Sequence, residues 1–330
     1  MNAPERRPQQ NLEDDAVLPF AVEALDVRGR VVRLGHALDD LLADHGYPNL
    51  VSRLVAEATA LAALLASSLE FEGRFTLQTQ TDGPVSMIVV DIQAPGKMRA
   101  YANFDADRVA ALGERYDAGE LMGRGHLAMT IEHPGDVNRY QGIVALEGGN
   151  LEDAAHQYFA QSEQIPTRVR LAVAEEMQAK ENSRWRAGGV LLQFLPREAA
   201  RARQADLNPG DSPEGTSHHE VTPDDAWVES QSLIATVEDV ELVDPALSSE
   251  QLLWRLFHER GVKVFGARKV SAECRCSIDR LRTILKNFSA EERESMVEDG
   301  HVRVKCEFCG KRYHFKPEEI GLAQGTKPRS

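Results

Sequence analysis

Cysteine is absent from the first 273 of the 330 residues of this chain. The sequence also lacks an uninterrupted run of about 18 apolar residues, so we expect no membrane-spanning helix. No apolar core follows Arg6 and Arg7 near the start, and no secretory signal is expected. Positive charge is in deficit, because 38 Lys and Arg face 52 Asp and Glu, which gives a net charge of −14. These features predict a cytoplasmic protein that does not bind membranes and whose surface as a whole does not attract nucleic acid.

The charge that is present is unevenly distributed. Residues 251–330 hold 17 Lys and Arg against 11 Asp and Glu, a net charge of +6, so residues 1–250 carry −20. A hydrophobic fraction of 42% is sufficient for a folded core. A length of 330 residues exceeds one average domain. We therefore expect two or three folding units, with a separate C-terminal module that the acidic remainder attracts.

Strand patterns punctuated by a few helices occupy the first two thirds of the chain. Apolar residues at three- and four-residue steps predict a helix from Asn49 to about Leu69, and Asn150 caps a second helix. The expected strands cover residues 74–80, 85–92, 98–104, 126–132, 139–146, 169–173 and 190–195. Turns such as Asp82-Gly83-Pro84 join consecutive strands, which indicates an antiparallel meander. The fold class is therefore α+β, with a mixed core domain over residues 16–197 that holds an antiparallel sheet.

An acidic helical linker follows the core domain. Residues 198–222 contain turn formers and charges with almost no apolar residues, so they form an insertion, and the linker extends to residue 257. Thr222-Pro223-Asp224-Asp225 starts a helix that we expect to run to about Val243, and Ser248 with Gln251 forms a capping box before another. Their apolar stripes are thin, so these helices depend on packing against something else. Residues 258–320 form the C-terminal module, and residues 1–15 and 321–330 are expected to be disordered tails.

All four cysteines lie within 36 positions, as a Cys-x-Cys pair and a Cys-x-x-Cys pair: Cys274, Cys276, Cys306 and Cys309. Clustered cysteines in an intracellular chain indicate a metal or redox site rather than a disulfide framework. Zinc takes four thiolates in a tetrahedron, which two closely spaced pairs supply, so we predict one four-thiolate Zn²⁺ site. Two alternatives stay open. The first is that four reduced cysteines are buried together by coincidence, which does not explain why they occur in two close pairs. The second is that the Cys-x-x-Cys dithiol acts alone in disulfide exchange, which gives the other pair no role.

The predicted zinc site leads to a hypothesis about switching. A module of this size gains only about 3–5 kcal/mol from its hydrophobic core. Structural zinc contributes on the order of 10–16 kcal/mol in small modules. Oxidants attack thiolates, and a disulfide within either pair removes two ligands. We therefore expect oxidation to expel the ion, unfold the module and free the acidic linker packed near it.

Several other residues could in principle bind a metal, act as a nucleophile or bind phosphate, but each has a simpler interpretation. His301 and His314 flank the second cysteine pair, but with four thiolates available we expect them outside the ligand set. Ser162-Glu163-Gln164 lies in a polar turn without a nearby base, and Gly188-Gly189 lacks the Lys-Ser/Thr that a phosphate loop requires. Large aromatic residues are expected in the core: Tyr140, Tyr158, Phe159 and Trp185. We predict no catalytic residue and no enzyme.

Short stretches in both halves of the chain match the pattern of one known family. They are Phe71-Glu72-Gly73-Arg74, Asp82-Gly83-Pro84, Tyr140-Gln141-Gly142-Ile143-Val144, Tyr158-Phe159, residues 161–167, Ala187-Gly188-Gly189 with Gln193 and Pro196, Leu256-Phe257-His258-Glu259, and the cysteine pairs that end in Cys306-Glu307-Phe308-Cys309. In order and over about residues 16–320, the sequence resembles the bacterial redox-regulated heat-shock holdases, the 33 kDa chaperonin family.

The resemblance implies an ATP-independent chaperone that is inactive when reduced and zinc-bound. It implies that peroxide or hypochlorite, under unfolding conditions, pairs Cys274 with Cys276 and Cys306 with Cys309. Zinc is then released, the linker unfolds, and the protein forms a homodimer that holds unfolding clients during heat shock and oxidative stress. Two features depart from the pattern: the insertion at 198–222, and Arg275, a cation expected to sharpen thiolate reactivity.

Two other functions are weighed against the holdase. A zinc-ribbon nucleic-acid-binding regulator agrees with the +6 module but conflicts with the −20 remainder, and a gel shift by reduced protein would favour it. A dithiol oxidoreductase predicts insulin reduction with turnover. Suppression of client aggregation only after peroxide treatment would favour the holdase.

Overall fold

The computed structural model describes residues 14–68, 72–135, 139–176, 184–195 and 224–322. Its strands are β1 Ala16–Val22, β2 Val27–Leu34, β3 Arg74–Thr81, β4 Val85–Gln93, β5 Lys97–Phe104, β6 Arg124–Glu132, β7 Arg139–Glu147, β8 Thr167–Glu176, β9 Arg184–Phe194, β10 Lys263–Val264, β11 Arg268–Lys269, β12 Ser271–Ala272, β13 Val297–Glu298, β14 His301–Lys305 and β15 Arg312–Phe315. Its helices are α1 His36–Leu42, α2 Asn49–Ser68, α3 Ala106–Ala111, α4 Ala118–Met122, α5 Leu151–Tyr158, α7 Asp225–Ala235, α8 Asp239–Val243, α9 Ser249–Phe257, α10 Ile278–Lys286 and α11 Ala290–Ser295, with short turns of helix at Glu23–Leu25, Phe159–Glu163 and Pro317–Ile320.

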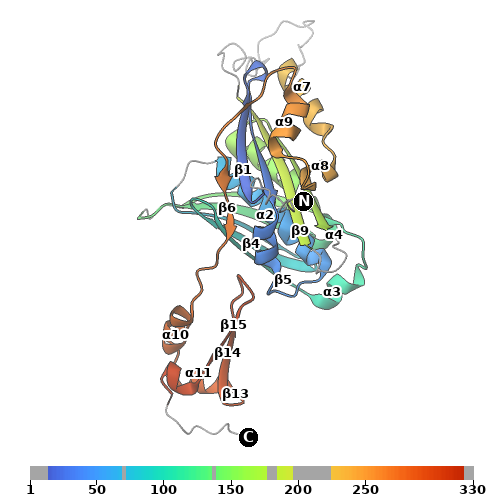
Figure 1. The fold of residues 1–330 in the computed structure, drawn as a ribbon. Coiled ribbons are helices and arrows are strands. Elements are labelled where there is room, and N and C mark those ends of the chain that lie inside the picture. The colour runs from blue at the N-terminus through green and yellow to red at the C-terminus, as the bar shows by residue number, and fades with distance from the viewer. Residues whose placement is uncertain (1–13, 69–71, 136–138, 177–183, 196–223, 323–330) are drawn as a thin grey trace, which may run out of the picture.

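Two large sheets and one small sheet organise these strands (Figure 1). Sheet A has the order β10-β1-β2-β9-β8, with β11 also paired to β1, and sheet B has the order β12-β5-β4-β3-β6-β7. The third sheet, β13-β14-β15, belongs to the C-terminal module. In the described residues, neighbouring strands are antiparallel except β12 and β5, which are parallel.

The predicted α+β class is therefore confirmed, and the predicted strands correspond to β3 through β9. The core nevertheless has two sheets instead of the single one expected, and the hairpin of β1 and β2 was not predicted.

Helix α2 forms the centre of the core between the two sheets (Figure 1). One of its faces packs on sheet A residues such as Val32 and Leu191, and another packs on sheet B residues such as Leu77 and Val90. By length and composition α2 is apolar enough to cross a membrane. The lack of an uninterrupted apolar run was therefore a wrong reason to exclude such a helix. Its most apolar window is 83% buried within the fold, which identifies α2 as a core helix.

The linker helices α7, α8 and α9 cover the other face of sheet A. Because side chains alternate along a strand, residues next to those that face α2 point to this side. They form an apolar cluster with the linker: Leu18, Phe20, Val31, Val190, Leu192, Trp227, Ile234, Leu242, Leu252 and Phe257. The molecule is thus layered as sheet B, α2, sheet A and linker.

The linker differs from the sequence prediction in two respects. The expected single helix to Val243 is two helices, because the chain leaves α7 at Thr236 and a capping box between Glu238 and Glu241 starts α8. The linker packs on sheet A, at the opposite end of the molecule from the cysteine module, and not near that module as expected (Figure 1). The insertion at 198–222 lies outside the described residues.

Two buried arginines hold the C-terminal end of α8. Arg33, which is 2% exposed, donates to the carbonyls of Glu241 and Asp244 at 2.6 and 2.7 Å. Arg186 donates to the carbonyl of Val243 at 2.7 Å and pairs with Asp14 at 2.9 Å. Cations at a helix C-terminus satisfy its free carbonyls and its dipole. The linker is therefore attached to sheet A by polar as well as apolar contacts.

Residues at the predicted domain boundaries make contacts that the sequence did not indicate. Asp15, assigned to the N-terminal tail, accepts hydrogen bonds from the backbones of Gly35 and Ala37 at 2.8 and 3.1 Å. Leu322, assigned to the C-terminal tail, is buried in the module. Residues 263–272, grouped with the module, pair with sheets A and B instead. Residues 1–13 and 323–330 of the two predicted tails lie outside the described residues.

Candidate metal centre

The two cysteine pairs lie at the ends of ordered elements. Cys274 and Cys276 follow β12, and Ser277 then caps α10 by accepting a hydrogen bond from the backbone of Arg280 at 3.2 Å. The second pair forms a tight turn between β14 and β15, in which the Gly310 amide donates to the Cys306 carbonyl at 2.8 Å. We call residues 306–310 the knuckle.

All four thiol sulfurs gather in one place. They lie within 4.8 Å of one another and are half-buried. The sulfur of Cys274 lies 3.8 Å from that of Cys306, and the sulfur of Cys276 lies 3.4 Å from that of Cys309. A tetrahedral Zn²⁺ site with Zn–S bonds of about 2.3 Å requires sulfurs about 3.8 Å apart. The donor type, number and spacing therefore fit a four-thiolate zinc ion.

A tyrosine at the edge of the cluster was missed by the sequence analysis. The hydroxyl of Tyr313, on β15, lies 3.1 Å from the sulfur of Cys276. Burial alone would raise the pKa of Cys276. Hydrogen bonds from Tyr313 and from the neighbouring thiols together outweigh this effect, so the pKa of Cys276 lies below its ordinary value. Burial raises the pKa of Cys306 and of Cys309. The surroundings of the cluster therefore shift the pKa of Cys276 and the pKa values of the second pair in opposite directions.

The histidines near the knuckle do not join the cluster. Among the described residues, the only group with metal-binding spacing consists of the four cysteines. His301 lies on the module surface, with Nδ1 3.3 Å from the carbonyl of Asp299. His314 is exposed on β15. This agrees with the expectation that both lie outside the ligand set.

The module has a small core of its own. It consists of five buried side chains: Leu285, Val302, Phe315, Ile320 and Leu322. Several half-buried residues pack around it, including Leu281 and Val304. So little apolar burial gives the module few sources of stability apart from a metal cross-link.

The knuckle docks against the core domain. The Arg99 guanidinium stacks on the ring of Phe308 at 3.8 Å, and the Tyr101 ring meets Phe308 edge-on with centroids 4.8 Å apart. Lys305 donates to the carbonyl of His45 at 3.2 Å. A Cβ at Gly310 would overlap the backbone at Asp44. Aromatic and cationic contacts of this kind join the cysteine module to sheet B and to the loop before α2.

Arg275 contributes to this interface. It pairs with the carboxylate of Asp91 at 3.2 Å, and the same carboxylate accepts from Arg99 at 2.7 Å. Asp91 is 4% exposed, and Arg74 lies 3.4 Å away. The guanidinium is therefore engaged by the core domain, and its effect on thiolate reactivity stays a prediction.

Three other sequence features have structural roles. Glu163 accepts hydrogen bonds from Tyr140 and Tyr158, each at 2.8 Å, so it fixes two aromatic side chains. Tyr158 is buried as expected, whereas Tyr140 is 48% exposed. Gly188 lies under the linker, because a Cβ there would be 2.7 Å from the carbonyl carbon of Leu242.

Comparison with known proteins agrees with this architecture. The model of the Hsp33 protein family matches residues 15–316. The 33 kDa chaperonin of Caulobacter vibrioides is 45% identical over 314 residues, covering 94% of this chain and 97% of that protein. The 33 kDa chaperonin of Escherichia coli strain K12 is 32% identical over 309 residues, covering 93% and 94%.

A solved structure has the same fold. The 33 kDa chaperonin of Thermotoga maritima superposes with a TM-score of 0.70 at 20% identity, covering 93% of this chain and 96% of that one. The family match extends over both the core domain and the cysteine module. The chain therefore belongs to the Hsp33 family of 33 kDa chaperonins.

Proposed function

We propose that this protein is a redox-regulated, ATP-independent holdase of the cytoplasm. In this proposal it is inactive while reduced and zinc-bound, and it binds unfolding proteins after oxidation. The observation that carries the proposal is the gathering of four thiols within 4.8 Å, in a module with a small core. Membership of a chaperonin family supports the chaperone activity.

Cys274, Cys276, Cys306 and Cys309 would hold one Zn²⁺ as thiolates. When bound, the ion supplies a cross-link between the start of α10 and the knuckle, worth on the order of 10–16 kcal/mol in comparable modules. The apolar core of such a module supplies only about 3–5 kcal/mol. Ligand loss is therefore expected to unfold residues 274–322.

Oxidation removes the ligands in a balanced step. Two thiolates give up one electron each to one peroxide molecule, form a sulfur–sulfur bond, and two protons are taken up as the peroxide becomes two waters. Two peroxides therefore convert all four thiolates into two disulfides, and the oxidised module no longer holds the ion.

The pairing of the disulfides remains a proposal based on the family resemblance: Cys274 with Cys276, and Cys306 with Cys309. The shortest sulfur distances run between the two pairs, at 3.8 and 3.4 Å, but all four sulfurs lie close together. Proximity in the reduced cluster therefore does not select a pairing. Peptide mapping of the oxidised protein by mass spectrometry identifies it.

The module communicates with the linker through the chain between them. Residues 258–273 connect α9 to Cys274, and part of this segment pairs with both sheets. When the module unfolds, this segment loses its anchor, and the helices α7 to α9 lose one of their attachments. Their departure would uncover the apolar face of sheet A, which includes Leu18, Phe20 and Val190. A contiguous apolar surface of this kind is suited to unfolded proteins and to a homodimer.

The proposal is tested by peroxide titration of the reduced protein. We expect one zinc per chain, released in parallel with loss of helical signal in circular dichroism. Suppression of thermal aggregation of a client enzyme should appear over the same range without ATP, together with a dimer in sedimentation. Equal suppression by the reduced protein, or retention of zinc after full thiol oxidation, would contradict the proposal.

The nucleic-acid alternative is not favoured. The aromatic side chain of the knuckle, Phe308, packs between Arg99 and Tyr101 and is not presented to a partner. The remainder of the chain also carries a net charge of −20, which opposes binding of a polyanion. The absence of a salt-sensitive gel shift is the expected result.

A further inference from the structure

The segment of residues 263–272 lies on the edges of both large sheets. Val264 and Lys263 pair with Phe20 and Ala21 of β1, and β11 pairs further along the same strand. β12 then pairs in parallel with β5, at the edge of sheet B. One short, extended segment therefore covers two sheet edges in the described structure. We call residues 263–272 the edge segment.

The edge segment is held mainly by backbone hydrogen bonds. The amides of Phe265 and Val270 donate to the carbonyls of Pro19 and Asp15, at 2.9 and 2.8 Å. The amide of Ser271 donates to the carbonyl of Gly96 at 3.0 Å. The side chains contribute less, because Val264 and Phe265 are 45% and 54% exposed. Backbone pairing does not depend on the side chains of the partner, so another extended chain can make the same bonds.

The edge of β1 lacks the charged side chains that exposed strands usually carry. Its sequence, Ala-Val-Leu-Pro-Phe-Ala-Val, contains no charged residue, and Pro19, which has no amide hydrogen to donate, is its one protective feature. The opposite edges of the two sheets are charged: β8 carries Arg168, Arg170 and Glu176, and β7 carries Arg139 and Glu147. Proteins use charges to prevent edge strands from pairing with other chains. In β1 the edge segment prevents such pairing, because it occupies the edge.

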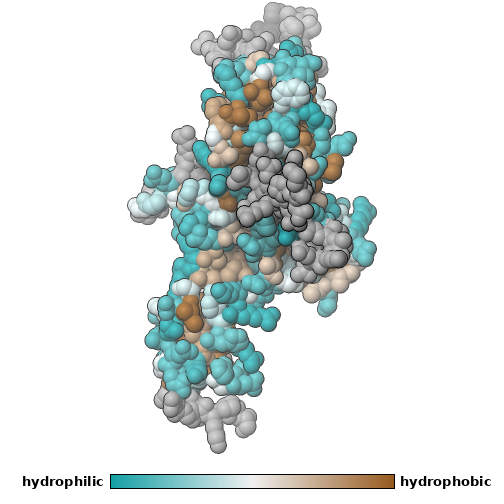
Figure 2. Space-filling view, in the orientation of Figure 1, coloured by the Kyte–Doolittle hydropathy of each residue, from teal (hydrophilic) through white to brown (hydrophobic). Residues whose placement is uncertain are grey.

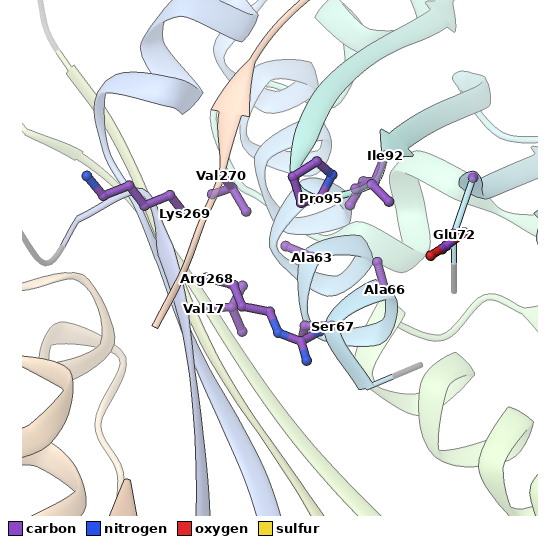
Figure 3. A pocket seen from close by; sticks show the side chains of 13 residues that line it. Val17, Ala63, Ala66, Ser67, Glu72, Ile92, Pro95, Arg268, Lys269 and Val270 are labelled. Carbon is purple, nitrogen blue, oxygen red and sulfur yellow. The ribbon is translucent and has the colours of Figure 1, made fainter. Parts of the chain in front are cut away.

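An apolar cavity of about 920 Å³ lies beside the edge segment. Figure 3 shows the segment passing between β1, which carries Val17, and the turn after β4, which carries Pro95, with Ala63 and Ala66 of α2 between them. Val270 lines this cavity and packs against the main core. Departure of the segment would leave both an unpaired edge and an apolar cavity next to it.

Hydrophobic side chains also appear on the surface at the end of the molecule that carries β1 and α7 to α9 (Figure 2). Exposed apolar residues there include Val228, Val240 and Trp254 of the linker and Phe265 of the edge segment. The edge of β1 thus lies in the part of the molecule that the proposed function opens to clients.

We propose that an extended apolar segment of an unfolding client pairs with the edge of β1 after the edge segment leaves it. The client strand takes over the hydrogen bonds to Asp15 and Pro19 and places an apolar side chain in the cavity that Val270 lines. The inference rests on the proposed holdase function, because oxidation is what releases the edge segment. Seven residues of β1 offer roughly 23 Å of edge, enough for a short extended peptide.

Amide hydrogen exchange tests the proposal in the full-length protein. The carbonyls of Asp15 and Pro19 point to the edge segment. Because alternate residues of a strand direct their backbone groups to the same side, the amides of Val17 and Ala21 also point to the edge segment. These two amides should exchange slowly in the reduced protein and faster after oxidation. They should become protected again when an unfolded client is added. The amides of Leu18 and Phe20, which face β2, serve as the internal reference.

A synthetic peptide with the sequence of residues 263–272 supplies a sharper test. It should bind the oxidised protein, compete with a client, and fail to bind the reduced protein, whose edge is occupied. N-methylation at the amides that correspond to Phe265 and Val270 removes two of the donors to β1 and should weaken binding at least about fivefold. N-methylation at the positions of Val264 and Lys269, whose amides face away, is the matched control.

The outcomes separate the two proposals. Failure of the oxidised protein to suppress aggregation contradicts the holdase function itself. If the oxidised protein suppresses aggregation but added client does not slow amide exchange at Val17 and Ala21, the holdase function stands and the β1 site is overturned. Equal binding of both N-methylated peptides also overturns it. Concentration-dependent protection without client would assign the edge to a second copy of the chain and would likewise overturn the proposal.

Discussion

Replacement of Gly188 by alanine tests whether close packing keeps the linker on sheet A. Gly188 lies in β9, and a Cβ at this position would be 2.7 Å from the carbonyl carbon and 3.1 Å from the Cβ of Leu242. Carbon atoms in contact normally lie about 3.5–4.0 Å apart. Helix α8 must therefore move by about 1 Å, which also strains its hydrogen bonds to Arg33 and Arg186.

The expected size of the effect follows from this overlap. Forcing an extra methyl group into a packed site costs about 1–3 kcal/mol. Because the strand is fixed within sheet A, most of this energy should weaken docking of the linker. A factor of ten in population corresponds to about 1.4 kcal/mol, so the undocked linker should become up to about 5- to 140-fold more populated.

The assay uses reduced, zinc-bound protein. Gly188→Ala should bind more of an apolar dye, show a red-shifted tryptophan emission and suppress client aggregation without oxidant. Trp227 reports on the linker, because its ring lies 5.8 Å from that of Phe194 in the docked state. The zinc content should stay at one per chain, since Gly188 contacts α8, which lies away from β13, β14 and β15 of the cysteine module (Figure 1).

Gly149→Ala is the matched control. A Cβ at Gly149 would meet only Asp153, at 3.6 Å or more, which is an ordinary contact. This variant should behave as wild type in all three measurements. If reduced Gly188→Ala also behaves as wild type, close approach of α8 to sheet A is not what keeps the linker docked, and the reasoning is refuted.

Three further predictions concern other parts of the molecule. Cys309→Ser should lose zinc and the dispersed NMR signals of residues 277–320, since five buried side chains are too few to fold the module; retained dispersion would contradict this. Tyr101→Ala removes one of the contacts to Phe308, so the module should be more mobile relative to the core domain in ¹⁵N relaxation while zinc affinity is unchanged; unchanged relaxation would contradict this. Burial raises the pKa of Glu57 from 4.5 to about 7, although Tyr116 donates a hydrogen bond to it. A carboxyl whose pKa is higher in the folded state destabilises the fold as pH rises between these values, so Glu57→Gln should reduce the fall in Tm from pH 5 to pH 8; an identical fall in both proteins would exclude this role.

The sequence predicted those elements whose side chains carry a regular signal. Strands β3 to β5 alternate and are separated by Asp82-Gly83-Pro84 and Pro95-Gly96, so their meander was expected and is confirmed. The cysteine cluster was expected from spacing alone, and the structure brings all four sulfurs together. Ligand spacing is informative because few structures other than a metal site require it.

Other features leave no such signal. β1 is apolar on both faces, since one side packs on α2 and the other on the linker, so it does not alternate. The edge segment is held by backbone bonds, which the sequence does not encode. Buried Arg33 and Arg186 look like surface residues until α8 is placed over them. These contacts depend on tertiary packing, which overrides local propensity.

The layer over sheet A belongs to the same polypeptide as the sheet itself. A tethered partner acts at an effective concentration set by its connection, not by the amount of protein in solution. The docked state of the linker should therefore hold equally well whether a cell contains few copies of the reduced protein or many. In the proposed function, a change in expression alone would then leave the surface of sheet A covered.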